Sequence, residues 1–397
     1  MKKILSILLA LTMIVTCFAA CGQKTPQEDD KKPAGQIAAI AKDDLKIGVI
    51  HIGDPADGAG YSYAHDLGIQ EMQKNLGLND AQIVRKNNID DGDAVATRAA
   101  IEDCIAQGCN VIFGTSFNYM DTMEALAGEH PEVIFSHGTG FKSNGSNFNN
   151  YFGRIYQARY LAGIAAGLKT KTNKIGYVAA FGTELAETAS GINAFALGVQ
   201  AVNPEAKVFV KTLQSWFDPA NETAYAEALI NMGCDVISQH CDTANPQVAA
   251  QKAGVFGCGY NSDMTEQAPK AHLTATVWHW GVYYTKAVQA VMDGKWVEFG
   301  NYYEGAKEGL VDVSPLSDNC APTTAEKIDA VKALYKEGTW DVFSGVKLSF
   351  KDNEIVKTDA DLKDNKGNVI VAAGGASVED KMLTGDMHFF VEGVELV

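Results

Sequence analysis

The chain has 397 residues, of which 46% are hydrophobic and 21% are charged, the balance of an ordinary globular protein. A formal net charge of −16 argues against nucleic acid as a partner, because binding to phosphates needs a basic face. The length exceeds that of one typical hydrophobic core, so we expect two lobes.

The first 20 residues have the pattern of a secretory signal peptide. Lys2 and Lys3 precede an apolar run at 4–15 that is too short to cross a bilayer as a permanent helix. Two alanines then precede Cys21, as in the bacterial lipobox, in which the cysteine is acylated and becomes the new N-terminus. Residues 21–44 are expected to be a flexible tether, since the stretch after Cys21 is polar and has no apolar periodicity. The sequence predicts an extracytoplasmic, membrane-anchored lipoprotein held on the lipid bilayer through Cys21; a signal whose cysteine is incidental is the alternative.

The eight cysteines do not form a metal-binding pattern. Cys17 would leave with the signal peptide and Cys21 would carry the lipid. No CxxC pair occurs among the others, so a structural zinc site is not expected. Buried free thiols are the first interpretation, and one disulfide among them is left open. These six are Cys104, Cys109, Cys234, Cys241, Cys258 and Cys320.

One order of strands and helices occurs twice. Short apolar runs of strand length open both passages, at 46–50 and 174–178. A helix, a second strand and a second helix follow in each, and related phrases at 107–112 and 232–237 end the second helix and begin a buried strand. The repeat predicts an α/β fold with two doubly wound parallel-sheet lobes. Because such sheets bind ligands at the carboxyl ends of their strands, the loops after the strands are the places to look for a site.

The later part of the chain is expected to contain one more strand, at 273–277, and a helix at 281–292, before short strands begin at about 345. The predicted organisation is a signal peptide at 1–20, a tether at 21–44, an N-terminal lobe at 45–155 with a return segment at about 278–315, a C-terminal lobe at 156–277, and a β-rich C-terminal segment at 316–397 packed on the lobes.

The loop after the first strand offers a mixed binding surface. Tyr61 has a flat face for stacking, and Ser62, His65 and Asp66 can form hydrogen bonds with a ligand. The alternative is that the loop only shapes a turn and that Asp66 only caps the next helix. The loop has no Lys, no Arg and no GxGxxG pattern, so it does not favour phosphate.

Further candidates follow later strands. Ser116 and Phe117 come after the strand at 111–113 and suit a pocket that both stacks and hydrogen-bonds, although Ser116 could simply cap a helix. Trp216 is the expected wall opposite Tyr61, with burial at the edge of its own lobe as the alternative. The remaining candidates that follow strands of the second lobe are Gln239, His240, Asp242, Asn261, Asp263 and Trp278.

Neither a metal site nor catalysis is expected. His240, Cys241 and Asp242 are consecutive, and neighbours on a strand point to opposite faces, so they cannot all reach one ion. The sequence has no GxSxG, HExxH, phosphate-binding loop or kinase motif, and no catalytic residue or cofactor is predicted. An unrecognised enzyme that uses His65, Asp66 and His240 as acids and bases stays as the alternative.

Several stretches together resemble the basic membrane protein family, the purine nucleoside receptor type of ABC-transporter substrate-binding lipoproteins. The resemblance extends from about residue 46 to 315 and implies a type I periplasmic-binding-protein fold, a ligand cleft between two lobes, a purine ligand and ABC permease subunits as partners. A monomer is expected. The stretches are 60–66, 174–178, 191–195, 216–219, 262–264 and 391–394.

The resemblance also implies how the ligand is held, with the base stacked between aromatic rings and the ribose held by an aspartate and a lysine. Tyr61 matches the aromatic position, whereas Ser62 stands where these receptors carry asparagine. Asn261 and Trp278 stand at the positions of the ribose-binding aspartate and lysine. The replacement of that aspartate and lysine by Asn261 and Trp278 removes two charge-assisted hydrogen bonds of about 1.5–3 kcal/mol each. This change favours a nucleobase slightly over a nucleoside. A binding protein for a sugar, a flavin or an autoinducer, and a purine-processing hydrolase, are the alternatives.

Overall fold

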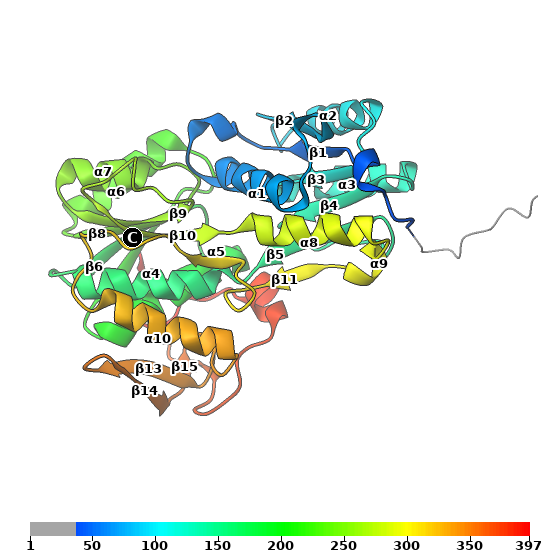
Figure 1. Cartoon of the computed structure of the whole chain (residues 1–397). Helices are drawn as coiled ribbons and strands as arrows, with labels where there is room; N and C mark the ends of the chain where they lie inside the picture. The colour runs from blue at the N-terminus through cyan, green and yellow to red at the C-terminus, as the bar shows by residue number, and fades with distance from the viewer. Residues whose placement is uncertain (1–36) are drawn as a thin grey trace, which may run out of the picture. The chain divides into compact units, whose positions relative to one another are not determined.

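Residues 37–397 are described by the computed structural model (Figure 1). The predicted signal peptide, Cys21 and most of the expected tether lie outside the described residues. None of the helices within 37–397 combines the length and the apolar character needed to span a membrane.

Six strands form the first sheet, in the order β11-β5-β4-β3-β1-β2, and all neighbours are parallel. Alternate side chains of a strand point to opposite faces. Phe113 accordingly packs with α1 (Tyr61–Leu76) and α8 (Trp280–Met292), whereas its neighbour Ile112 packs with α2 (Ala94–Ala106) and α3 (Met120–Glu129). Helices therefore cover both faces. The strands are β1 (Ile47–Ile50), β2 (Ile83–Lys86), β3 (Val111–Gly114), β4 (Ile134–Gly138), β5 (Phe148–Gly153) and β11 (Tyr302–Glu304).

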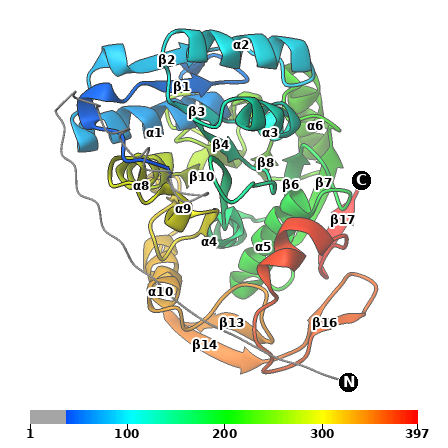
Figure 2. The same cartoon turned by 90° about the vertical axis from the view of Figure 1, so that its right-hand side faces the viewer.

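Seven strands form the second sheet, in the order β12-β10-β9-β8-β6-β7-β17. Neighbours are parallel except β12, which pairs antiparallel with β10. Tyr177 packs with α4 (Ile155–Lys169) and α5 (Ala186–Val202), and Val178 packs on the other face with α6 (Pro219–Asn231) and α7 (Asn245–Ala253). Figure 2 shows β17 beside β7 at the edge of this sheet. The strands are β6 (Lys174–Ala179), β7 (Lys207–Thr212), β8 (Val236–His240), β9 (Phe256–Asn261), β10 (His272–Trp278), β12 (Val311–Val313) and β17 (Val394–Leu396).

The predicted α/β architecture of two parallel-sheet lobes is confirmed. The described chain passes between the two sheets from β5 to α4, from β10 to α8 and from β11 to β12. The last passage differs from the expected return segment at 278–315, because β12 pairs with β10 and so belongs to the second sheet.

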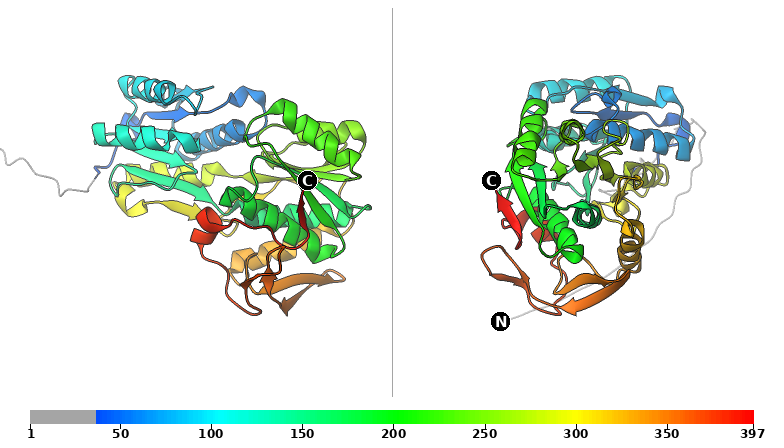
Figure 3. Two further views of the ribbon diagram at one scale, coloured as in Figure 1. Left: turned by 180° about the vertical axis from the view of Figure 1, so that it is seen from behind. Right: turned by 90° about the vertical axis from the view of Figure 1, so that its left-hand side faces the viewer.

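The C-terminal segment begins with a helix that the predicted β-rich stretch at 316–397 did not include. This helix, α10 (Thr324–Glu337), packs against the second lobe through Ile328, Val331 and Tyr335. Seen from behind, in Figure 3, the chain then runs through an antiparallel β-hairpin at 346–359 and returns to the second sheet. The remaining elements are β13 (Val346–Lys351), β14 (Glu354–Asp359), β15 (Leu362–Lys363), β16 (Val369–Val371) and the π-helical turn η5 (Met382–Asp386). The six cysteines of the described residues are free, and Cys320 is the one that is only half-buried.

Candidate functional site

A cavity of about 1050 Å³ lies at the carboxyl ends of strands from both sheets. We call it the interlobe cavity. Tyr61, Ser116 and Phe117 line it from the first lobe, and Trp216 and Asp242 line it from the second. Five of the predicted site residues therefore border one space, although they are distant in sequence. This is the position that parallel-sheet lobes dictate for a ligand.

Aromatic side chains form much of the lining. Trp216 packs edge-on against Phe181, with ring centroids 5.6 Å apart, and Phe117 lies 6.3 Å from Phe141. Tyr61 lies at the start of α1, where its hydroxyl donates to the Thr115 carbonyl. Further aromatic lining residues, which were not among the predicted site residues, are Phe141, Phe152, Tyr156, Phe181, Tyr260 and Tyr303.

Three predicted residues of the first lobe do not line the cavity. The sequence predicted a loop as far as residue 66, but α1 begins at Tyr61. Ser62, His65 and Asp66 are therefore helical residues; His65 and Asp66 follow Ser62 by three and four positions and share its inward side of the helix. Ser62 Oγ accepts a hydrogen bond from Gly53 N at 2.9 Å, and His65 is fully buried, stacked on Trp280 with centroids 4.4 Å apart.

Asp66 belongs to an ion pair inside the first lobe. Arg85 Nε lies 2.5 Å from its Oδ1, and Gln70 donates to its Oδ2 at 2.7 Å. Burial opposes ionisation, but the contact with His51 Nε2 at 3.7 Å and the hydrogen bonds from Arg85 and Gln70 outweigh it and hold the pKa of Asp66 well below its ordinary value. These contacts are structural, because they fix α1 to β2.

The second-lobe candidates on β8 and β9 are also internal. Both faces of this sheet are covered by helices, so residues within a strand are enclosed. Gln239 donates to the Thr243 carbonyl at 2.6 Å and accepts from Gln247 at 2.9 Å. His240 is fully buried, and its ring lies 4.8 Å from that of Tyr260. Asn261 lies behind the lining and donates to Asp242 Oδ1 at 3.0 Å.

The last two candidates also lie away from the lining. Asp263 accepts hydrogen bonds from the amide and hydroxyl of Thr265, at 2.9 and 2.6 Å, and so caps a turn. Trp278 is 4% exposed and stacks on Trp280, with centroids 4.3 Å apart. Neither Trp278 nor Trp280 lines the interlobe cavity.

The charge of the lining is mainly acidic. Lys381 is its basic residue, and this side chain pairs with Asp386 at 2.5 Å. Burial raises the pKa of Asp242 to about 8, against the hydrogen bond from Asn261, and burial raises the pKa of Glu187 to about 7, against the attraction of Arg159. The acidic lining residues are Asp91, Glu184, Glu187, Asp242, Asp380 and Asp386.

Glu187 was not among the predicted site residues, although the repeat contained a signal. The loop after the strand at 174–178 is the counterpart of the loop that carries Tyr61, and its acids are Glu184 and Glu187. The sequence prediction began the second-lobe helix at residue 192, whereas α5 begins at Ala186 and holds Glu187 in its first turn.

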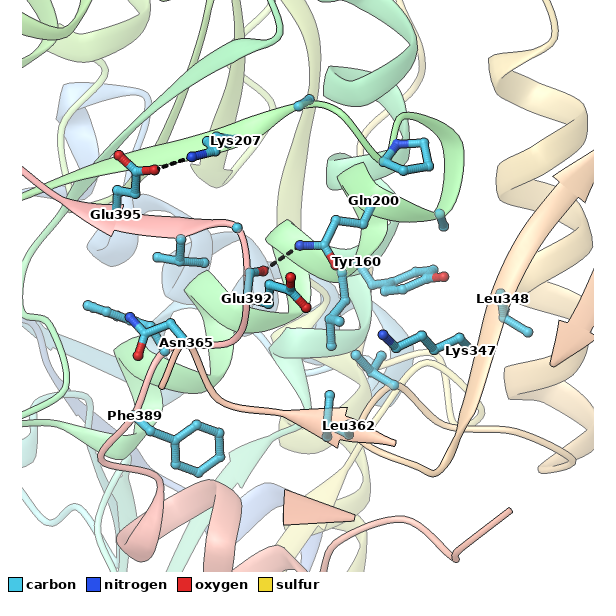
Figure 4. A pocket seen from close by; sticks show the side chains of 18 of the residues that line it. Tyr160, Gln200, Lys207, Lys347, Leu348, Leu362, Asn365, Phe389, Glu392 and Glu395 are labelled. Carbon is cyan, nitrogen blue, oxygen red and sulfur yellow. Dashed lines mark hydrogen bonds and ion pairs between the residues drawn. The ribbon is translucent and has the colours of Figure 1, made fainter. Parts of the chain in front are cut away.

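A second cavity, of about 1100 Å³, lies between α5, β7 and the C-terminal segment (Figure 4). Two pairs of its lining residues bind each other: Lys207 pairs with Glu395 at 2.6 Å, and Gln200 donates to the Glu392 carbonyl. None of the predicted site residues lines it. The interlobe cavity is therefore the candidate site.

Comparison with known proteins agrees with this geometry. Residues 45–343 match the family model described as ABC transporter substrate-binding protein PnrA-like. The chain belongs to this family. The PnrA-like chain is 35% identical over 359 residues to a purine-binding protein of Brucella abortus (strain 2308), covering 90% of this chain and 95% of that protein. It is 33% identical over 336 residues to a putative ABC transporter glucose-binding protein of Haloferax volcanii, covering 85% of this chain and 77% of that protein.

Solved structures show the same fold. A transcriptional activator of the comK gene from Bacillus halodurans has a TM-score of 0.62 at 22% identity, covering 74% of this chain and 98% of that one. An ABC transporter solute-binding protein from Conexibacter woesei also has a TM-score of 0.62, at 18% identity, covering 75% of this chain and 98% of that one. The predicted type I periplasmic-binding-protein fold is confirmed. A PnrA-like substrate-binding protein is extracytoplasmic, and its partners are a small solute and the permease of an importer.

Proposed function

We propose that this PnrA-like protein captures a purine in the interlobe cavity, a nucleobase slightly ahead of a nucleoside, and presents it to an ABC permease. The observation that carries the proposal is a lining that combines flat aromatic rings with hydrogen-bond-accepting acids. A purine has a large π-face for Trp216 or Tyr61 and N–H groups for the carboxylates. The excess of acids disfavours phosphorylated ligands, because like charges repel in a cavity of low dielectric constant.

The preference for a base follows from Asn261 and Trp278. Both are buried behind the lining, and neither supplies a charge to a ribose. A ribose would bring hydroxyl groups into the cavity, where each unpaired group costs about 1–3 kcal/mol. Among the lining acids, Asp242 is the one beside Asn261, and Asn261 already occupies one of its oxygens.

A second candidate is a sugar. The name of the Haloferax relative favours glucose, whereas the name of the Brucella relative favours a purine. Aromatic rings and carboxylates also serve sugar binding, so the lining alone does not separate the two. The hydrolase alternative has no such support, because the acid–base set it would need, His65, Asp66 and His240, lies outside the lining.

Isothermal titration of purified protein separates these functions. Adenine, guanine, their nucleosides and glucose are titrated in turn, and nucleosides are checked for products after prolonged incubation. We expect the bases to bind at least as tightly as their nucleosides and far more tightly than glucose. Tight glucose binding without a purine response would replace the proposal, and product formation would indicate an enzyme.

We also propose that acylated Cys21 anchors the protein to a membrane. The sequence pattern before Cys21 supports this proposal. Cell fractionation of Cys21→Ala tests it: loss of the protein from the membrane fraction is expected, and full membrane retention would refute the anchor.

A further inference from the structure

Glu187 differs from the other acids of the interlobe cavity, because its carboxylate has no hydrogen-bond partner among the described residues. His240 Nε2 lies 3.8 Å from its Oε1, which is beyond hydrogen-bonding distance. The side chain is 19% exposed, so water solvates it only in part. Each of the other five lining acids accepts a side-chain hydrogen bond. The donors are Ser116 for Asp91, Gln214 for Glu184, Asn261 for Asp242, Arg154 for Asp380 and Lys381 for Asp386.

A buried arginine behind the lining explains why an acid is tolerated here. Arg159 is fully buried and lies over the Tyr260 ring at 4.0 Å, and it attracts the Glu187 carboxylate. Arg159 donates to the Gln239 carbonyl at 2.6 Å, but its Nε and one terminal nitrogen have no partner within the described chain. The enclosed arginine supplies positive charge near Glu187 but forms no hydrogen bond with it. Both carboxylate oxygens of Glu187 therefore stay free for a ligand.

The aromatic wall and this carboxylate lie close enough to hold one ligand. The Trp216 ring is 5.6 Å from the His240 ring, and the same imidazole is 3.8 Å from Glu187. Burial and Arg159 keep the pKa of His240 well below its ordinary value, so the imidazole is neutral and does not neutralise Glu187. A planar ligand on Trp216 can therefore direct one edge toward Glu187.

An unpaired carboxylate selects a particular edge. Its two oxygens accept two parallel hydrogen bonds, and the ring N1–H and 2-amino group of guanine are two parallel donors. Hypoxanthine offers only the N1–H, and adenine places an acceptor nitrogen beside its amino group. On the basis of the proposed purine function, we propose that Glu187 reads the edge of the purine ring and selects rings with adjacent N–H and amino donors, as in guanine, over adenine.

Protonation should modulate this selection. Burial raises the pKa of Glu187 to about 7, and the attraction of Arg159 opposes this rise. A protonated carboxyl donates once and accepts once, which suits adenine, so preference for guanine should increase with pH between about 6 and 8. The titratable or charged groups around Glu187 are Arg159 on α4, His240 on β8, Asp242 after β8, Tyr260 on β9, Tyr303 on β11 and Tyr61 on α1.

The test measures the affinities of guanine, hypoxanthine and adenine for the wild type, Glu187→Gln and Glu227→Gln. Glu227 is a matched control, because it is an acid on α6 outside the interlobe cavity, paired with Lys252 at 3.8 Å. At about pH 8 we expect the wild type and Glu227→Gln to bind guanine about tenfold more tightly than adenine. Glu187→Gln should prefer adenine, because an amide donates and accepts as adenine requires.

The outcomes separate this inference from the proposed function. If the wild type binds none of the three purines, the proposed function fails and the inference fails with it. If purines bind but the guanine-to-adenine ratio is the same in the wild type and Glu187→Gln, the inference alone is refuted. If Glu187→Gln does not fold, the wild type decides by itself: equal affinity for guanine and hypoxanthine, with no change in the guanine-to-adenine ratio between about pH 6 and pH 8, would refute it.

Discussion

At the scale of single residues, Gly60 is a point where the backbone of the first lobe meets the second lobe. Its φ of 84° and ψ of −163° lie in a region that is essentially restricted to glycine. A Cβ atom there would lie 2.2 Å from the Asp242 carbonyl oxygen of the second lobe. Gly60 N also donates to Ser262 Oγ at 3.1 Å, so the first-lobe loop touches the second lobe through its backbone.

We therefore predict that Gly60→Ala weakens ligand binding by about tenfold or more, because the lobes can no longer meet at this point. Most of the loss should be in a faster dissociation rate, measured by stopped-flow tryptophan fluorescence. Gly58→Ala is the matched control, because Gly58 also has a positive φ, 72°, but an added Cβ would meet nothing within 4 Å. Wild-type dissociation in Gly60→Ala, or an equal effect of both variants, would contradict the role of this contact.

At the scale of elements, the strands and first helices of the repeat could be predicted because short apolar runs and their turns carry local information. The strand predicted at 46–50 appears as β1 and that at 174–178 as β6, each within one residue at its ends. The site was harder to predict. The predicted start of α1 was six residues too late, so His65 was placed in a loop, whereas it lies on the inward face of the helix. No local pattern shows that Glu187 faces Arg159 from another helix. Long-range pairing decides both.

The helix α10 was missed for a different reason. Its apolar residues Ile328, Val331 and Tyr335 recur at helical spacing, and Gly338 ends it in a left-handed conformation. The local signal for this helix is therefore present in the sequence, just before the short strands that make the rest of the segment β-rich.

The turn η5 is an element that belongs to the C-terminal segment and yet lines the interlobe cavity. Asp380 precedes it and is paired with Arg154, whose Nε and terminal nitrogen lie 3.2 and 2.6 Å from the two carboxylate oxygens. Arg154 lies between β5 and α4, where the chain passes between the lobes, and its Nη1 donates to the Tyr303 carbonyl at 2.8 Å. The ion pair thus ties this cavity wall to the connection between the lobes.

We predict that Asp380→Asn loosens this wall with little loss of global stability. The pair is partly exposed, at 23% for Arg154 and 50% for Asp380, so it contributes about 0.5–1 kcal/mol. Hydrogen exchange of the amides at 382–387 should accelerate several-fold, while amides of β6 keep their protection. Lys363→Ala is the control, since it removes an exposed ion pair with Asp361 elsewhere in the same segment. Unchanged exchange at 382–387 would show that other contacts fix the wall.

At the scale of the whole molecule, the acids of the cavity couple ligand capture to stability. Burial raises the pKa of Glu187 to about 7 and of Asp242 to about 8, so the empty folded protein resists ionising both. A carboxyl whose pKa is raised on folding binds its proton more tightly in the folded state. Its contribution to stability is therefore lost as the pH rises from its pKa in the unfolded chain toward its pKa in the folded protein. Below about pH 6.5 the buried histidines act in the opposite direction, because the pKa values of His65 and His240 are lowered on folding and the unfolded chain takes up their protons.

Between about pH 6.5 and pH 8 the folded protein releases the protons of both acids, and this loss of stability outweighs the opposing contribution of the histidines, which are half-protonated in the unfolded chain at about pH 6.5. We predict that the ligand-free protein loses about 1–2 kcal/mol of stability across this window, a decrease of a few degrees in the thermal midpoint. The double variant Glu187→Gln with Asp242→Asn should show a flatter profile and a higher midpoint at about pH 8, because it has no charge to desolvate there.

A ligand that donates hydrogen bonds to these acids stabilises their ionised forms, so saturating guanine should raise the wild-type midpoint more at about pH 8 than at about pH 6.5. Thermal unfolding followed by circular dichroism at both pH values, with and without ligand, measures all three effects. A flat profile in the ligand-free wild type, or the same slope in the double variant, would show that the cavity acids are not a store of electrostatic strain and that ligand binding draws on other contacts.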